Sequence, residues 1–491
     1  MRFDATGSMM SRAVVVAAAA AVLLPVRAAE AIPAFARKYQ TSCQTCHIAF
    51  PKLNPFGEVF RLRGYRMPEE TEDMIKELPV QLGAPAYKRV WPDAVWPSDI
   101  PGTIPVSLNT VFSDVTQRTL VPSHSETTIK NDFRFPEEVG LLTGGTLGET
   151  LSFLGELAFE PGVHDGGEEV EVALEHSQLN FNGPFGSGLR FNLKIGRFAP
   201  EITQPLSHGA VLTTGGPAPL LQFVPIAEHG GSEIGGHGHG AAGIALPHSV
   251  DGIEAYGVLG HRFLYSGGLA NGLGPGEESF DGNNAKDVYG RVAVKIGGLP
   301  LDGADYEASD ENWREKSLRI GFFGYRGDGT GTRVGGTGHH ADELIEDRSF
   351  TRVGADVNAY FQDLNITWGF VRGRDTLATY EVMANDGHDE GEESDEHGEG
   401  EETGEPEFVT EADFTYRTWF AEADYVFMPW LHGAMRYEWL DPANSRAPTF
   451  ERIVPNLTAL VRANVKAYVE YQRNIGASDN YLLLGGLQFA F

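Results

Sequence analysis

Cysteine is almost absent from this chain, which has 2 cysteines in 491 residues. No closed zinc constellation appears in the sequence. Long apolar runs are also missing, because the one sustained run, Ala13–Val26, is shorter than the roughly 20 residues that a membrane-spanning helix needs. This run follows Arg12 and precedes the small-x-small sequence Ala29-Glu30-Ala31. It predicts a signal peptide over residues 1–31.

Basic residues are in the minority, with 38 Lys and Arg against 68 Asp and Glu and a net charge of −30. This balance excludes nucleic acid and an anionic membrane surface as partners and favours cations. The acidic run 386–407, which includes His388 and His397, could concentrate Fe²⁺ by its field, although most acidic loops are simply solvated surface. The sequence contains no nucleophile triad and no phosphate-binding loop. Enzymatic activity other than redox chemistry is not indicated.

The two cysteines stand in a single motif, Cys43-Gln44-Thr45-Cys46-His47. This C-x-x-C-H spacing predicts one covalently bound haem c, with thioether bonds to Cys43 and Cys46 and with His47 as an axial iron ligand. Between His47 and Pro101 the only methionines that could bind the iron are Met67 and Met74, and this segment contains no further histidine. Met67 is the candidate for the second axial position. The alternatives are that Met67 only packs in the pocket wall, that a residue of the following domain binds the iron, or that the position is open.

Beyond Pro101 the sequence alternates between apolar and polar residues over segments of about ten residues. One example is Leu189–Ile195, and another is Val465–Tyr471. This period predicts strands whose two faces meet different media. Strands are expected at 103–115, 132–144, 150–160, 168–182, 188–199, 251–259, 262–270, 286–297, 316–326, 348–361, 363–374, 411–427, 430–440, 450–461, 464–473 and 480–491.

Three features favour a transmembrane barrel over a soluble sandwich. Charged residues of both signs occupy one face of nearly every strand, as in a water-filled lumen. Aromatic residues gather at expected strand ends, where interface girdles would lie: Trp419, Tyr425, Phe427, Trp430 and Trp439. The long connections 200–250, 327–347 and 375–410 all fall on one rim. The fold class is therefore an all-β transmembrane antiparallel barrel of about 16 strands, although the long inner connection 298–315 leaves the count open by two.

The domain organisation follows from these patterns. Residues 32–100 form a small monohaem cytochrome c domain that ends in a proline-rich linker, and residues 101–491 form a porin-like β-barrel. Helical or irregular pieces are expected at 51–65 and 69–78, with apolar residues that could wall a haem pocket. An outer loop carries His229, His237, His239 and His248, and a second carries His339 and His340. Such imidazoles could bind Fe, Zn or Cu, or could belong to glycine-rich loops without a metal.

The segment from Pro33 to Tyr65, with the motif Cys43–His47 followed by Pro51-Lys52-Leu53-Asn54-Pro55-Phe56-Gly57, resembles the fused monohaem cytochrome–porin family of outer-membrane iron oxidases. The terminal residue Phe491 resembles the ending of bacterial outer-membrane proteins. The family likeness implies outer-membrane electron transfer from extracellular Fe(II), or another redox donor, to a periplasmic cytochrome c. It implies that the haem domain lies in the periplasm or inside the lumen. Only Cys43, Cys46 and His47 take a role from the family.

Two rival functions remain at this stage. The first is a solute porin with a periplasmic haem domain, and the second is an outward conduit to extracellular acceptors other than iron. The expected surroundings are the outer membrane of a Gram-negative bacterium and its lipid. A homotrimer is one expected assembly, because porins are commonly trimers, although no interface is identifiable in the sequence.

Overall fold

The computed structural model describes residues 34–68, 105–121, 126–147, 150–164, 167–202, 211–214, 246–272, 285–307, 309–334, 343–382, 407–441, 449–475 and 480–490. The expected signal peptide, the linker and the second helical piece at 69–78 lie outside these residues. No helix in the described ranges is both long and apolar enough to cross a membrane.

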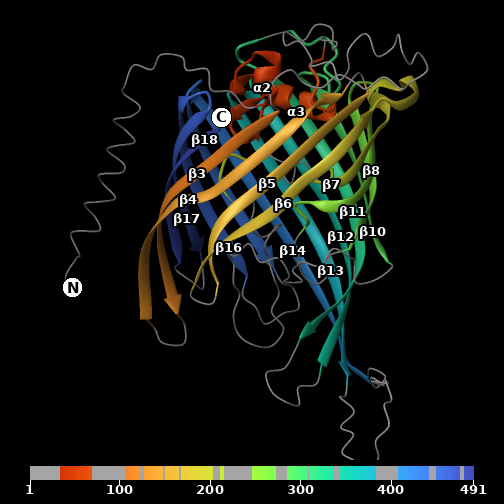
Figure 1. The fold of residues 1–491 in the computed structure, drawn as a ribbon, viewed down its shortest axis with the longest axis vertical. Helices are drawn as coiled ribbons and strands as arrows, with labels where there is room; N and C mark the ends of the chain where they lie inside the picture. The colour runs from red at the N-terminus through yellow and green to blue at the C-terminus, as the bar shows by residue number, and fades with distance from the viewer. Residues whose placement is uncertain are drawn as a thin grey trace, which may run out of the picture.

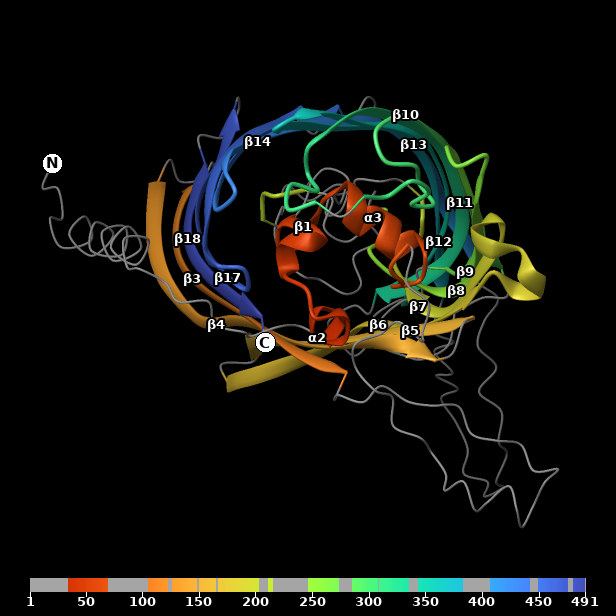
Figure 2. The ribbon, with the colours of Figure 1, turned by 90° about the horizontal axis from the view of Figure 1, so that it is seen from above.

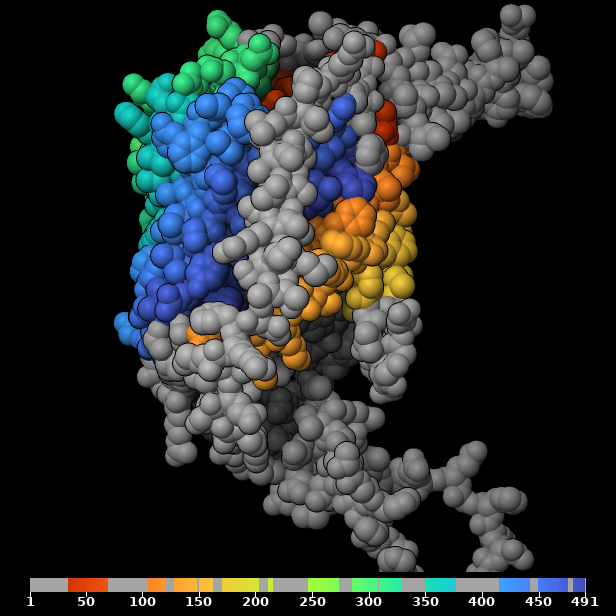
Figure 3. Space-filling view, turned by 90° about the vertical axis from the view of Figure 1, so that its left-hand side faces the viewer, coloured from red at the N-terminus to blue at the C-terminus, as the bar shows by residue number. Residues whose placement is uncertain are grey.

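The main body is a closed barrel of 16 antiparallel strands, each paired with its sequence neighbours (Figure 1). The last strand, β18, pairs with the first barrel strand, β3, and so closes the ring (Figure 3). The strands are β3 (Val106–Val121), β4 (Glu126–Leu147), β5 (Leu151–His164), β6 (Gly167–Asn182), β7 (Asn192–Phe198), β8 (Val250–Leu259), β9 (Phe263–Asn271), β10 (Lys286–Gly297), β11 (Glu315–Val334), β12 (Glu343–Gln362), β13 (Leu364–Val382), β14 (Glu407–Met428), β15 (Leu431–Asp441), β16 (Phe450–Arg462), β17 (Val465–Ile475) and β18 (Tyr481–Ala490).

The barrel and its 16 strands are confirmed, and the count is not off by two. The main errors of the sequence reading lie at strand ends. Leu189 is not in a strand, because Gly188–Arg190 forms the short 3-10 helix η4 and β7 begins at Asn192. Trp419 is not at a strand end, because β14 extends back to Glu407. Likewise β11, β12 and β13 run well into the regions expected to be loops.

The barrel carries its polar residues inside and its apolar residues outside. In β10 the inward residues Asp287, Arg291 and Lys295 are buried, whereas the outward residues Val292 and Ile296 are 44% and 59% exposed. Water-soluble proteins rarely expose such continuous apolar surface. The alternation therefore matches a barrel with a charged lumen and an apolar exterior.

The N-terminal segment lies inside one mouth of the barrel, where Figure 2 shows it within the ring of strands. It consists of α2 (Ala34–Tyr39), the 3-10 helix η1 (Cys43–Thr45), the small hairpin of β1 (His47–Ala49) and β2 (Lys52–Leu53), and α3 (Pro55–Leu62). We call residues 34–68 the plug. Most turns at this rim are short, the exceptions being 183–191 and 298–314, and we call it the inner rim.

Two connections between strands fold towards the plug and the lumen. The inner connection 298–314 folds over the plug, which explains why it is long. On the opposite side, the connection after β7 was expected to be an outer loop. Its described residues instead turn into the lumen, where Ile202 and Leu212 are buried and Leu212 N donates to Glu422 Oε1 at 2.6 Å.

Candidate haem site

The two cysteines sit on one tight turn at the start of the plug. Ser42 precedes η1, Thr45 N donates to Ser42 O at 3.1 Å, and Cys46 N donates to Cys43 O at 3.2 Å. Both cysteines are partly exposed and neither is in a disulfide. Burial raises the pKa of Cys43 to about 11 and that of Cys46 to about 12, so both are neutral thiols at pH 7.

The His47 ring is held by a hydrogen bond to the backbone of the plug. Its Nδ1 lies 2.9 Å from the carbonyl oxygen of Pro51, which can only accept a hydrogen bond. This contact places the proton on Nδ1 and the lone pair on Nε2. Metal-binding histidines usually donate their second nitrogen in this way. The donor set of Cys43, Cys46 and His47 therefore fits a c-type haem.

Asn54 joins the cysteine turn to α3. Its backbone N–H donates to Cys46 O at 2.9 Å, and its Nδ2 donates to the carbonyl oxygens of Gln44 and Thr45 at 3.1 and 3.0 Å. Its Oδ1 accepts from Gly57 N at 2.9 Å and so caps the helix. Asn54 is fully buried. One side chain thus fixes both the turn and the helix.

An aromatic cluster lies beside Cys46. It is built on Tyr39, Phe56 and Phe60, and Cys46 and Met67 pack against it as partly buried residues. Met67 therefore lies in the neighbourhood of the haem motif, which agrees both with the ligand prediction and with simple packing. Met74 lies outside the described residues.

The inner connection 298–314 covers this cluster. The Tyr306 ring lies 4.4 Å from the Phe56 ring, measured between centroids. Asn312 Nδ2 donates to Thr45 O at 3.0 Å, and Arg63 Nη1 donates to Asp302 O at 3.0 Å. The connection 298–314 thus covers the aromatic cluster of the plug.

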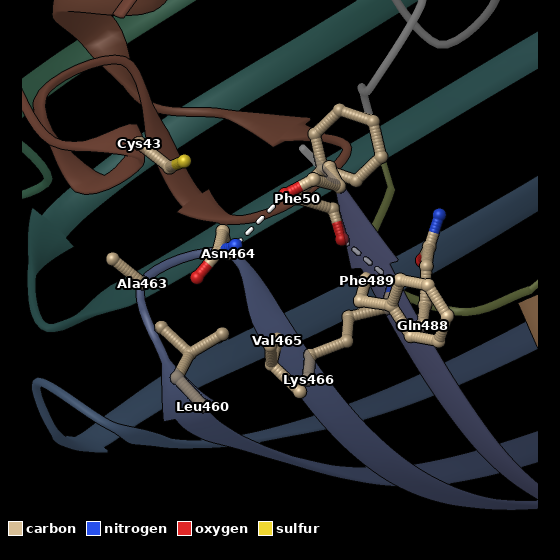
Figure 4. Close-up of a pocket in the computed structure, with 10 residues that line it drawn as sticks. Cys43, Phe50, Leu460, Ala463, Asn464, Val465, Lys466, Gln488 and Phe489 are labelled. Carbon is tan, nitrogen blue, oxygen red and sulfur yellow. Dashed lines mark hydrogen bonds between the residues drawn. The ribbon is translucent and has the colours of Figure 1, made fainter. Parts of the chain in front are cut away.

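A pocket separates the plug from the barrel wall on the other side of the motif (Figure 4). Cys43 and Phe50 line it from the plug, and Leu460, Lys466 and Phe489 line it from the wall. Lys466 Nζ donates to the carbonyl oxygen of Phe50 at 2.6 Å. The pocket joins residues that are more than 400 positions apart, which no local sequence pattern could reveal.

Buried charges fasten the plug to the lumen. Arg61 Nη1 lies 2.7 Å from Glu201 Oε2, and Glu201 Oε1 lies 2.7 Å from Arg291 Nη1. Burial by itself raises the pKa of Glu201, but Arg61 and Arg291 more than reverse this effect and hold its pKa well below the usual value. On the other side, Lys52 pairs with Asp424 of β14.

The histidine and acidic loops proposed as metal sites lie almost wholly outside the described residues, and His248 is exposed at their edge. No group of three or more His, Cys, Asp or Glu side chains suited to a metal ion occurs within the described ranges.

No family model matches this chain, and no curated protein matches it either. Among solved structures, OmpT of Vibrio cholerae is similar at 11% identity, over 79% of this chain and 97% of that one, with a TM-score of 0.41. The anion-selective porin of Comamonas acidovorans is similar at 12% identity, over 79% and 99%, with a TM-score of 0.42. The channel DcaP of Acinetobacter baumannii is similar at 12% identity, over 79% of this chain and 97% of that one, with a TM-score of 0.40. These likenesses concern barrels and carry no information on haem, substrate or redox partner.

Proposed function

We propose that this chain is an outer-membrane electron-transfer protein that holds one c-type haem in the inner mouth of its barrel. It takes electrons from an extracellular donor, Fe(II), and passes them to a periplasmic cytochrome c. The observation that carries the proposal is the position of Cys43, Cys46 and His47 inside the barrel. The resemblance of residues 33–65 to the fused cytochrome–porin family supplies the donor and the direction.

The exterior of the barrel supports a location in the outer membrane. Tyr425, Phe427 and Trp430 are exposed beside the inner turn between β14 and β15. Trp419 of β14 lies eight residues before Phe427. It pairs with Trp439 of β15 across the ladder. Eight residues span about 26 Å of strand. At the usual strand tilt of about 35–45°, this is about 20 Å of height, so the two aromatic groups lie near the two edges of an apolar band about 25 Å tall.

The residues of the plug define what the site can do. A bound haem would supply a one-electron Fe(III)/Fe(II) couple. Cys43 and Cys46 would hold its edge, and His47, oriented by Pro51, would hold the iron. The aromatic cluster and the cover with Tyr306 would limit access of water from the periplasm, which tunes the reduction potential. In the overall reaction, one Fe²⁺ would lose one electron and become Fe³⁺, and the periplasmic carrier would gain that electron.

The test is direct mixing of the oxidised holoprotein with Fe(II) while the haem absorption bands are followed. We expect the haem to become reduced and then reoxidised when an oxidised soluble cytochrome c is added. If Fe(II) leaves the haem oxidised on a physiological timescale, the donor assignment is wrong. Reduced protein mixed with Fe(III) chelates tests the outward direction.

A solute porin with a haem domain remains the second candidate, because the described fold is a closed barrel of porin type. The two functions differ in conductance. A barrel with the plug and residues 211–214 in its lumen should not pass ions in large steps in planar bilayers, whereas an open porin should.

A further inference from the structure

His432 is the second residue of β15 and faces the lumen, like Ala434 and Arg436 after it. It is only 1% exposed, and neither ring nitrogen makes a hydrogen bond of good geometry, although the backbone of Pro429 lies close enough to interact with the ring. Burying polar nitrogens without partners is unfavourable, and native proteins rarely do so without a reason.

Other described histidines have such partners. His176 Nδ1 lies 3.1 Å from Glu156 Oε2, and His261 Nδ1 lies 2.6 Å from Asp302 Oδ2. The charges that follow His432 on β15 are also paired, since Arg436 Nε lies 2.7 Å from Glu438 Oε1. His432 is therefore an exception within a lumen whose ionic groups are largely satisfied.

The barrel wall around His432 is the part of the wall that lies against the haem motif of the plug. Val426, its ladder neighbour on β14, belongs to the same buried cluster as Ile48, and Ala434 belongs to the same cluster as Ala49 and Leu460. Immediately before β15, Gln44 Nε2 donates to the carbonyl oxygen of Pro429 at 2.7 Å. Plug residues on both sides of Cys46 and His47 thus contact the strip of wall from which His432 projects. Leu460 continues this strip into the pocket beside Cys43.

We propose that His432 is the second axial ligand of the haem iron, so that the plug and the barrel wall each supply one imidazole. This assignment rests on the haem attachment proposed above. Imidazole is a common haem ligand, and no histidine occurs between His47 and Pro101 to serve instead. Met67 then packs against the aromatic cluster and does not bind the iron. A ligand on the wall would also tie the plug to the barrel through the iron.

The test is axial-ligand spectroscopy of the full-length holoprotein and four variants. We expect low-spin, bis-imidazole ferric haem in the wild type, shown by electron paramagnetic resonance and by the absence of a sulfur-to-iron charge-transfer band. His432→Ala should become high-spin and return to low-spin when imidazole is added. His432→Met should acquire the charge-transfer band and a higher reduction potential. His176→Ala, which removes another buried lumen histidine, should retain the wild-type spectrum.

A sulfur-to-iron band in the wild type that disappears in Met67→Leu would overturn the assignment, as would a His432→Ala spectrum identical to that of the wild type. His432→Met serves as the second readout if the alanine variant does not fold. Haem staining after denaturing electrophoresis separates the two proposals. Wild-type protein without covalent haem refutes the proposed function together with this assignment, whereas stained protein with unchanged ligation refutes only the role of His432.

Discussion

Asn54 and Gly57 are the two residues that hold the cysteine turn against α3. A Cβ atom on Gly57 would lie 2.0 Å from the carbonyl oxygen of Cys46, so no larger residue fits while Asn54 keeps its hydrogen bonds. The C-x-x-C-H motif can be read directly from the sequence because its residues are adjacent, and the haem that it predicts stays a prediction. The role of Asn54 could not be read in this way, because it depends on the tertiary contact between the turn and α3.

Gly57→Ala tests this contact. We expect loss of covalent haem or a destabilisation of about 1–3 kcal/mol, the usual cost of overpacking. Haem-stained denaturing gels and thermal unfolding measure the two effects. Gly324→Ala is the matched control, since a Cβ atom there meets nothing within 4 Å. Equal behaviour of the two variants would show that α3 does not pack closely on the turn.

Glu201 predicts a specific pH dependence. Its folded pKa is depressed, so its ionic contribution to stability is complete above the unfolded carboxyl pKa of about 4.3 and is lost only as the pH falls through the lower folded value. The wild-type contribution should therefore be unchanged between pH 7 and about pH 5. Glu201→Gln leaves Arg61 and Arg291 without this carboxylate and should cost about 3–5 kcal/mol at pH 7.

Unfolding followed from pH 7 down to pH 3 checks this prediction. Asp251→Asn is the control, because its ion pair with Arg197 is 45% exposed on the aspartate side. A Glu201→Gln variant as stable as the control at neutral pH would show that Glu201 does not fasten the plug to the lumen.

At the scale of elements, the membrane-facing parts of the strands were predictable and their ends were not. Alternation marks the segment in which one face meets lipid and the other meets the lumen. Beyond the predicted segments β12 and β13 continue as a hairpin, where the sequence no longer alternates regularly. The connection 298–314 looked too long for an inner turn because its packing against the plug could not be seen in the sequence. Leu301, for example, lies in one buried cluster with Leu62.

Tyr306→Ala tests the cover. Loss of the aromatic contact with Phe56 should cost about 0.5–1.5 kcal/mol beyond the lost apolar area and should increase solvent access to the haem. The expected results are faster bleaching of the haem by peroxide and a shifted reduction potential. Glu307→Ala, which changes an exposed residue of the same connection, should behave like the wild type. Unchanged bleaching in Tyr306→Ala would show that the cover does not shield the site.

At the scale of the whole molecule, the barrel architecture was predicted and the identity of the lumen contacts was not. The sequence indicates which residues face inward, but the pairing of Lys52 with Asp424 joins positions 372 apart. Only the closed ring determines which inward residues meet the plug.

Conductance measurements test whether these contacts keep the channel closed. Lys52→Met leaves Glu422 and Asp424 without their lysine and should loosen the plug, so that larger and more frequent current steps appear than in the wild type. Arg314→Met removes an ion pair at the exposed rim and should leave the traces unchanged. Large steps in the wild type itself would contradict a closed lumen.

The pocket beside Cys43 has a consequence for biogenesis. Phe50 and Lys466, which meet there, are 416 residues apart, and the ring closes only when β18 pairs with β3. A chain exported from its N-terminus, as the expected signal peptide implies, would present residues 43–47 to the periplasm long before the residues that form their pocket arrive. We therefore expect the plug to dock only after the ring has closed, and a haem at the proposed site would then report a completed barrel.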